Sequence, residues 1–220
     1  MRNALRLQLE QPNLYNEQSF EERLSLLLDH EFTQRRQRKI TRLIRQAKFR
    51  VIANLELPNY HAGRQLKKAQ IRSRAQGEWL RLYQNMLLTG STGCGKTYLA
   101  CAFGHHYYQQ GQTVTYDRLK ELLEKMYLVQ AEGSYRKFIK KLTSANLLIL
   151  DDWGLEPLNV QQRSDLLELI DAKYDSKSTL IASQLPIKNW YEMIGESNHA
   201  DAILDRLVHV QLKLNYKESR

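Results

Sequence analysis

The chain of 220 residues lacks the features of disulfide-rich and membrane proteins. Its only cysteines are Cys94 and Cys101, so no disulfide framework is expected, and this usage fits a reducing cytoplasm. The longest strongly apolar run, Leu147–Leu150, is far shorter than the roughly 20 residues that a membrane-spanning helix needs. The first residues contain no apolar segment typical of a signal peptide. These features predict a soluble cytoplasmic protein with no membrane partner.

Acidic residues are scarce in the first part of the chain. Residues 1–81 contain 17 Lys and Arg but only 8 Asp and Glu, a net charge of +9 that equals the net charge of the whole chain. The 16 basic and 16 acidic residues that follow cancel. This asymmetry predicts two domains: a helical, basic region over residues 1–80 for DNA binding and assembly, and a neutral catalytic domain over residues 81–220.

An acid-free stretch from Arg35 to Arg50 is the densest part of this charge. On a helix, at ~100° per residue, its apolar residues share one face; they are Ile40, Leu43, Ile44, Ala47 and Val51. The basic side chains are then left to bind the phosphates of double-stranded DNA; they are Arg35, Arg36, Arg38, Lys39, Arg42, Arg45, Lys48 and Arg50. Ordinary solvated surface charge is the alternative interpretation.

A separate helix is predicted ahead of this stretch. Ser19 and Glu22 have the spacing of a capping box, and leucines follow at helical spacing, so a helix over residues 19–32 is expected. Residues 1–18 show little pattern beyond Pro12, and we expect part of this segment to be mobile.

Residues Gly90–Thr97 fit the phosphate-binding pattern G-x-x-x-x-G-K-[ST]. The glycines let the backbone amides point at an anion, Lys96 would reach the β- and γ-phosphates, and the Thr97 hydroxyl would bind Mg²⁺. The predicted nucleotide-binding residues are Gly90, Ser91, Thr92, Gly93, Cys94, Gly95, Lys96, Thr97 and Tyr98. The expected cofactors are therefore ATP and Mg²⁺.

Strands and helices alternate around this loop. The predicted strands cover residues 85–89, 113–117, 147–152, 179–183 and 208–212, and the predicted helices cover residues 97–110, 119–128, 135–142, 160–174 and 199–207. This alternation predicts an α/β fold with a parallel sheet and a ligand site at the carboxyl ends of its strands.

Asp151 and Asp152 end the apolar strand at 147–152. Asp151 would hold Mg²⁺ beside Thr97, and Asp152 would polarise or deprotonate the attacking water. Many ATPases have Glu after the metal-binding Asp. Because Asp is shorter than Glu, we expect slow hydrolysis.

Three further polar residues are candidates for the site. Ser183 or Gln184, at the end of the strand at 179–183, would orient the water or sense the γ-phosphate. Arg206 lies on a helix whose apolar face points the other way, so it could serve as an arginine finger for the ATP of a neighbouring subunit. Taken alone, a solvated surface arginine is the favoured interpretation.

Several motifs in the same order together resemble the IstB-like ATP-binding proteins, which are transposition helper ATPases of the AAA+ class related to the DnaC helicase loaders. They are Gly90–Thr97, Leu147–Gly154, Ile181–Pro186 with Trp190, Ala202–Leu207, Glu218–Arg220 and the helical region Phe20–Phe49. The resemblance implies an AAA+ sheet of order 5-1-4-3-2 behind a small helical N-terminal region. It also implies ATP-dependent self-assembly on DNA and a transposase partner that is directed to its target.

The resemblance implies specific roles for two arginines of this chain. Arg206 matches the arginine finger of the family, and Arg220 matches its second sensor arginine. Gln184 stands where the family usually has Asn. The expected activity is ATP hydrolysis stimulated by DNA and by oligomerisation.

Three alternatives remain from the sequence. A DnaC-like helicase loader shares most motifs and would prefer single-stranded DNA and a replicative helicase. A small-molecule kinase needs an acceptor site and a basic lid, which residues 113–145 do not obviously supply. A DNA-binding module with a vestigial nucleotide site would not need Lys96, Thr97, Asp151 and Arg206 together.

Overall fold

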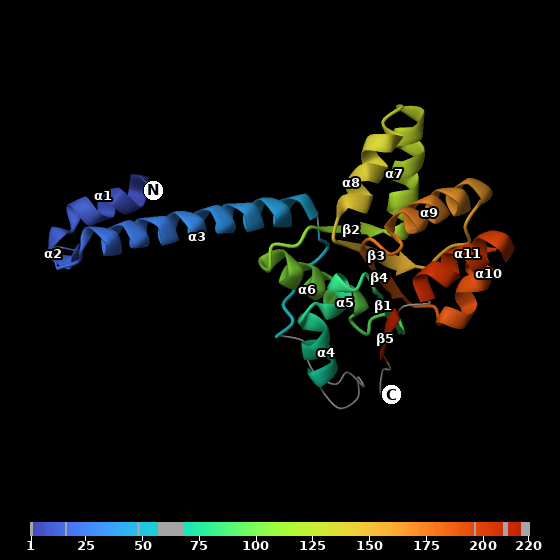
Figure 1. The fold of residues 1–220 in the computed structure, drawn as a ribbon. Helices are drawn as coiled ribbons and strands as arrows, with labels where there is room; N and C mark the ends of the chain where they lie inside the picture. Colours follow the sequence, from blue (N-terminus) through green and yellow to red (C-terminus); the bar gives the residue numbers. More distant parts are fainter. Residues whose placement is uncertain are drawn as a thin grey trace. The chain divides into compact units, whose positions relative to one another are not determined.

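A computed structural model describes residues 2–15, 17–47, 49–56, 68–195, 197–208 and 211–216 (Figure 1). The chain forms two compact units, residues 1–45 and residues 46–220. The domain boundary predicted between residues 80 and 81 separates a DNA-binding region from an ATPase domain. This functional division stays a prediction. Within the described residues, no helix is both long and apolar enough to cross a membrane.

The N-terminal unit is helical. It contains α1 (Arg2–Glu10), α2 (Pro12–Tyr15) and most of α3 (Phe20–Ala47). The capping box at the start of α3 is confirmed, because the Glu22 amide donates to Ser19 Oγ at 3.2 Å and the Ser19 amide donates to Glu22 Oε2 at 2.7 Å.

The structure differs from the expectations for this region in two ways. Residues 2–10 and 12–15, in which the sequence shows little pattern, form α1 and α2, and the side chain of Gln8 donates to the backbone oxygen of Arg23 on α3 at 3.0 Å. The separate helices expected before and within the basic stretch are one helix, because no Gly or Pro interrupts residues 20–47. Arg50 and Val51, which were expected on this helix, lie beyond its end.

The second unit is built on a parallel sheet. Its strands are β1 (Asn85–Gly90), β2 (Val114–Arg118), β3 (Leu147–Trp153), β4 (Ser178–Ser183) and β5 (Gln211–Tyr216). The order β2-β3-β4-β1-β5 is the predicted order 5-1-4-3-2 read from the other edge, so the predicted fold class is confirmed. The last strand was expected at residues 208–212, but it starts later because the preceding helix continues to Val208.

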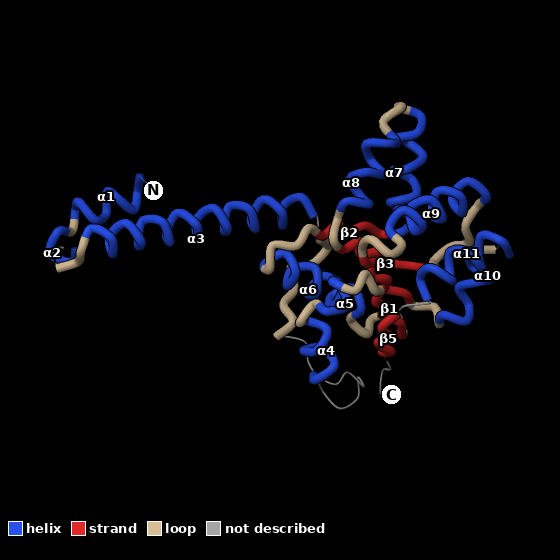
Figure 2. Tube along the Cα trace, viewed as in Figure 1, coloured by secondary structure: helices blue, strands red, loops and turns tan. Residues whose placement is uncertain are grey.

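Helices connect and cover these strands (Figure 2). They are α4 (Lys68–Ala75), α5 (Glu78–Arg81), α6 (Lys96–Gln109), α7 (Leu119–Ala131), α8 (Tyr135–Ser144), α9 (Val160–Lys173), a 3₁₀ turn (Ile187–Asn189), α10 (Trp190–Ile194) and α11 (Ser197–Val208). The five helices predicted from periodicity correspond to α6, α7, α8, α9 and α11. The short elements α4, α5 and α10 were not predicted.

The two faces of the sheet bury different residues. Leu87, Leu148 and Ile181 belong to the core shared with α7, α9, α10 and α11. Ile149 instead faces α6, where its side chain approaches Gly104. Burying one Leu or Ile side chain fully stabilises the folded state by about 1.5–3 kcal/mol. This burial holds each strand in its position in the sheet and therefore also determines where the polar residues at the strand ends lie.

Candidate nucleotide-binding site

A cavity of about 550 Å³ lies at the carboxyl ends of β1, β3 and β4. Its lining includes Arg50, Val51, Thr92, Gly93, Gly95, Lys96, Thr97, Tyr98, Asp151, Asp152 and Gln184. Its volume is in the range of small-molecule sites, about 300–1,000 Å³. The structure therefore brings together the phosphate loop, both aspartates and the candidate sensor from three separate stretches of sequence.

The phosphate loop leads from β1 into α6. Gly93 and Gly95 have φ angles of 82° and 99°, in the left-handed region, although a Cβ at either position would meet no atom within 4 Å. These glycines are therefore needed for their backbone conformation and not for space. Because α6 begins at Lys96, its unpaired N-terminal amides lie at the loop, where they favour an anion.

The remaining loop residues have distinct positions. Lys96 Nζ donates to the backbone oxygens of Gly90 at 2.8 Å and Ser91 at 2.7 Å. The side chain of Cys94 is buried and is not part of the cavity lining, whereas Tyr98 lines the cavity. The ammonium group of Lys96 is thus at the loop where a phosphate would lie.

Asp151 is buried at the end of β3, with 2% of its surface exposed. The Tyr116 hydroxyl donates to its Oδ2 at 2.7 Å, and the Asp152 amide donates to its Oδ1 at 2.9 Å. The hydroxyl of Thr97 and this carboxylate line the same cavity, and both supply oxygen atoms of the kind that holds Mg²⁺ together with substrate phosphates and water. The residues present therefore fit the expected metal.

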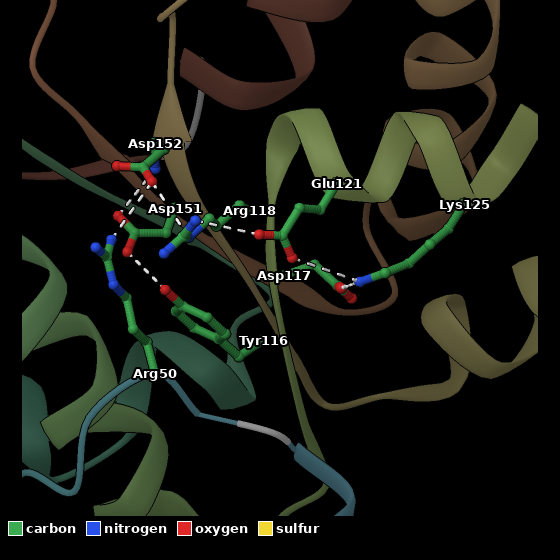
Figure 3. A network of polar contacts seen from close by, with 8 residues as sticks. All are labelled: Arg50, Tyr116, Asp117, Arg118, Glu121, Lys125, Asp151 and Asp152. Carbon is green, nitrogen blue, oxygen red and sulfur yellow. Dashed lines mark hydrogen bonds and ion pairs between the residues drawn. The ribbon is translucent and has the colours of Figure 1, made fainter.

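Asp152 has an unusual backbone and two cationic neighbours. Its φ of 55° places it in the left-handed region, which costs about 1–2 kcal/mol for a residue with a side chain. Its Oδ2 lies 3.4 Å from Arg118 Nε and 3.6 Å from Arg50 Nη1, and Arg118 Nη1 also lies 3.2 Å from Glu121 Oε1 (Figure 3). Such strain collects at functional sites, where surrounding contacts hold the residue in place.

The two candidates at the end of β4 differ. Ser183 is buried, and its hydroxyl oxygen lies 2.8 Å from the backbone oxygen of Trp153 and 3.1 Å from that of Leu185, either of which can accept its single hydrogen. Gln184 instead lines the cavity and accepts a 2.5 Å hydrogen bond from the Thr92 hydroxyl. Of the two candidates, Gln184 is the one that lines the cavity.

Arg206 does not project freely from α11 but contacts other residues of this chain. Its Nε lies 2.7 Å from Asp171 Oδ1 on α9, its Nη1 donates to the Ala202 oxygen at 2.9 Å, and its guanidinium carbon lies 6.0 Å from the ring centroid of Tyr174. It lines a second, small cavity with Lys173. The packing face of α11 is otherwise as predicted, because Ala200, Ile203 and Leu207 are buried.

The cationic candidates on α3 are on the surface. Arg35 pairs with Glu31 one turn earlier, at 2.8 Å, and the exposed side chains are Arg35, Arg36, Arg38, Lys39 and Arg42. At ~100° per residue, Arg35, Arg38, Lys39 and Arg42 share one face of this helix. For Arg45 the structure describes the backbone, and Lys48 and Arg220 lie outside the described residues.

Sequence reasoning missed two groups of residues. Tyr116 and Arg118 contact the two aspartates, and the signal available was their place at the end of the strand beside β3. The other group is four exposed cations on α8, which are Arg136, Lys137, Lys140 and Lys141. The net charge of residues 82–220 is zero, so it does not reveal this local cluster of cations.

Comparison with known families gives one match over nearly the whole chain. The family model described as "IstB-like ATP binding protein" matches residues 1–219. A putative insertion sequence ATP-binding protein, y4pL of Sinorhizobium fredii (strain NBRC 101917 / NGR234), is 43% identical over 191 residues, which are 87% of this chain and 78% of that protein. The putative ATP-binding protein of insertion sequence IS1162 from Pseudomonas fluorescens is 44% identical over 169 residues, which are 76% of this chain and 73% of that protein.

Solved structures are similar in fold. The DnaC helicase loader aligns with a TM-score of 0.64 at 24% identity, over 75% of this chain and 97% of that chain. DnaA of Aquifex aeolicus bound to AMPPCP aligns with a TM-score of 0.62 at 19% identity, over 76% of this chain and 51% of that chain. At these identities the likeness concerns the fold alone.

Proposed function

Because this chain belongs to the IstB-like ATP-binding proteins, we propose that it hydrolyses ATP, assembles on double-stranded DNA and helps a transposase to select or prepare its target. The observation that carries the proposal is the single cavity in which Lys96, Thr97, Asp151, Asp152 and Gln184 meet. A site that only held nucleotide would not need a second aspartate at the end of β3. The names of the curated relatives support the connection to insertion sequences.

In the proposed reaction each residue has one task. Lys96 binds the β- and γ-phosphates, while Thr97 and Asp151 would hold Mg²⁺. The metal supplies neutralisation of the phosphate charge when it is bound. Asp152 accepts a hydrogen bond or the proton of the attacking water, and Gln184 orients this water or contacts the γ-phosphate.

The proposed hydrolysis is slow in the isolated subunit. The carboxylate of Asp152 is shorter than that of Glu, and it is also paired with two arginines. While it is paired in this way, the carboxylate is less accessible to the attacking water. DNA binding and assembly are proposed to increase the rate by completing the site.

Assembly is proposed to add Arg206 from a neighbouring subunit. The contacts with Asp171 and Tyr174 support a fixed position for this guanidinium group. A pre-positioned arginine stabilises the charge that develops on a transferring phosphoryl group. The role of Arg220 as a second sensor of the nucleotide is likewise a proposal.

DNA binding is proposed to use the basic face of α3. The exposed arginines and lysine there neutralise phosphates without reading bases, so duplexes of different sequence should bind alike. The alternative function is loading of a replicative helicase, because the fold is similar to that of DnaC. A preference for single-stranded DNA and binding to a helicase would favour this alternative.

The test measures ATP hydrolysis and assembly together. The purified chain is mixed with duplex or single-stranded DNA, with and without the transposase encoded by the same insertion sequence, and Lys96→Ala serves as the inactive control. We expect hydrolysis that depends on Lys96 and increases with duplex DNA, and assemblies that form with ATP on duplex DNA and bind the transposase. Hydrolysis unaffected by Lys96→Ala, or no binding of transposase, would contradict the proposal.

A further inference from the structure

Arg50 follows α3 but is positioned by the second unit. The preceding residue, Phe49, packs its ring against α6 and β2, with centroid distances of 4.4 Å to His105, 5.5 Å to Tyr108 and 6.0 Å to Tyr116. A Cβ on Gly104 would lie 2.4 Å from a carbon of the Phe49 ring, so a larger residue at position 104 would displace this ring. Phe49 therefore anchors the chain immediately before Arg50.

The residues after Arg50 are anchored as well. His105 Nδ1 lies 3.1 Å from the amide nitrogen and 2.9 Å from the oxygen of Ala53, and the Asn54 amide donates to the Tyr98 hydroxyl at 3.3 Å. The thiol of Cys101 contacts the backbone of Val51 and Arg50, and burial raises the pKa of this thiol to about 11, so it stays protonated. The 49–54 segment thus lies along α6, the helix that carries Lys96.

The Arg50 side chain projects from this segment into the nucleotide cavity. It lines the cavity together with Lys96 and Thr97, and the carboxylate paired with it is that of Asp152, at 3.6 Å (Figure 3). The Arg50 side chain is 47% exposed and the Asp152 side chain 30%. An ion pair of this length and exposure is weak, so a more highly charged anion in the cavity can replace Asp152 as the partner of Arg50.

Arg118, the other cation at Asp152, is less suited to such an exchange. Its guanidinium group lies between Asp152 and Glu121, at 3.4 Å and 3.2 Å, so two carboxylates already compensate its charge. Of the two arginines at Asp152, Arg50 is therefore the one whose charge is more available to a ligand of this cavity.

We propose that Arg50 is a ligand of the terminal phosphate of a bound nucleoside triphosphate, and that it leaves Asp152 when it binds this phosphate. The inference rests on the nucleotide site proposed above and deepens it. It moves Arg50 from the DNA-binding group, where its place in the basic stretch had put it, to the nucleotide. It also gives Asp152 a second cationic partner while no triphosphate is bound, and it leaves Arg118 as the remaining arginine at this carboxylate when a triphosphate is bound.

The experiment compares equilibrium binding of a fluorescent non-hydrolysable triphosphate and of the matching diphosphate, with Mg²⁺. Arg50→Gln removes the guanidinium, Arg50→Lys keeps a cation without the planar fork, and Arg81→Gln removes one arginine from the exposed surface of α5 as a matched control. We expect Arg50→Gln to weaken triphosphate binding about ten-fold and diphosphate binding less than about two-fold. Arg50→Lys should recover part of the loss, and Arg81→Gln should behave like the wild type.

The inference is overturned if Arg50→Gln has the same ratio of triphosphate affinity to diphosphate affinity as the wild type. If thermal melting shows that this variant is unfolded, a wild-type ratio in Arg50→Lys overturns it instead. A salt slope of duplex binding that falls by about one unit with unchanged nucleotide affinity would return Arg50 to the DNA-binding group. Failure of the nucleotide site itself is distinguishable, because the wild type and Lys96→Ala would then bind triphosphate equally poorly.

Discussion

The hydroxyl of Tyr116 on β2 donates a 2.7 Å hydrogen bond to Oδ2 of the buried carboxylate of Asp151 on β3. This bond holds the carboxylate in one orientation, in the way that outer contacts orient metal ligands. Burial and the charge of Asp151 both raise the pKa of Tyr116 above its usual value, so the phenol remains a donor at physiological pH.

Tyr116→Phe should therefore weaken Mg²⁺ binding at the nucleotide site. We expect the Mg²⁺ concentration for half-maximal ATP hydrolysis to rise about ten-fold. Tyr108→Phe is a matched control, because Tyr108 is also buried and its hydroxyl bonds the Val114 oxygen away from Asp151. A magnesium titration of the ATPase rate decides the question, and equal behaviour of the two variants would contradict the assignment.

The two charged residues of the proposed reaction should fail in different ways. Lys96→Ala removes the cation facing the β- and γ-phosphates and should abolish productive ATP binding. Asp152→Asn should retain ATP and lose about a hundred-fold or more in hydrolysis, because its proposed role is on the water. Single-turnover hydrolysis and nucleotide binding are measured side by side. If Asp152→Asn hydrolyses ATP at the wild-type rate, the role given to Asp152 is wrong.

Most of the fold was predictable because it depends on local patterns. The apolar run at Leu147–Leu150 identifies a buried strand, and the glycine pattern of Gly90–Thr97 identifies a strand, loop and helix in one step. With the family resemblance, these patterns were enough for the strand order and for the convergence of the loop with Asp151.

The contacts between side chains from distant segments were not predictable. Periodicity placed Arg50 on a helix, and the packing of Phe49 against Gly104 moves it to the nucleotide cavity. Helical phase set Arg206 apart from the buried residues of α11, but phase carries no information about Asp171 on α9, with which Arg206 pairs. Such corrections arise from tertiary contacts, which no single stretch of sequence encodes.

Arg206 is expected to act on the ATP of a neighbouring subunit. Arg206→Ala and Lys96→Ala proteins should each be nearly inactive, since each lacks one part of every composite site. Mixed together, they should recover part of the ATPase activity, because a site that combines an intact phosphate loop with an intact arginine can form. The absence of recovery at any ratio, in mixtures shown to co-assemble, would contradict action between subunits.

The buried Lys173 should make the free energy of unfolding of this chain depend on pH. It is buried and donates to the Ala145 oxygen at 3.0 Å, and burial lowers the pKa of its ammonium group from 10.5 to about 7. Between these two values the unfolded chain binds more protons at Lys173 than the folded chain does, so the stability of the folded state rises with pH in this window.

The comparison of Lys173→Met with the wild type isolates this effect. From about pH 7.5 to pH 9.5, the free energy of unfolding of the wild type should rise relative to the variant by about 1.4 kcal/mol per pH unit. Lys188→Met is the control, because Lys188 is exposed. Urea unfolding at several pH values measures the difference. A difference that stays constant with pH would show that the folded chain keeps Lys173 charged.

DNA binding should depend on the exposed basic face of α3 and fall steeply with salt. On duplex DNA, log K drops by about 0.9 per log unit of salt for each phosphate neutralised. Replacing Arg38, Arg42 and Arg45 with Ala should therefore flatten the salt slope by up to ~2–3 units. DNA-independent ATP hydrolysis should remain, because the proposed nucleotide site is built from residues of the second unit, 46–220.

The matched comparison is a triple Ala variant of Arg136, Lys137 and Lys140, which removes three exposed cations from α8. Duplex binding is titrated with salt by fluorescence anisotropy, with saturating non-hydrolysable triphosphate, for the wild type and both variants. If phosphate binding is on α3, the slope changes in the α3 variant and stays near the wild-type value in the α8 variant. If the slope changes only in the α8 variant, the DNA contact is on α8, whose local excess of cations would also attract phosphates. A slope unchanged in both variants would exclude both helices as the main contact.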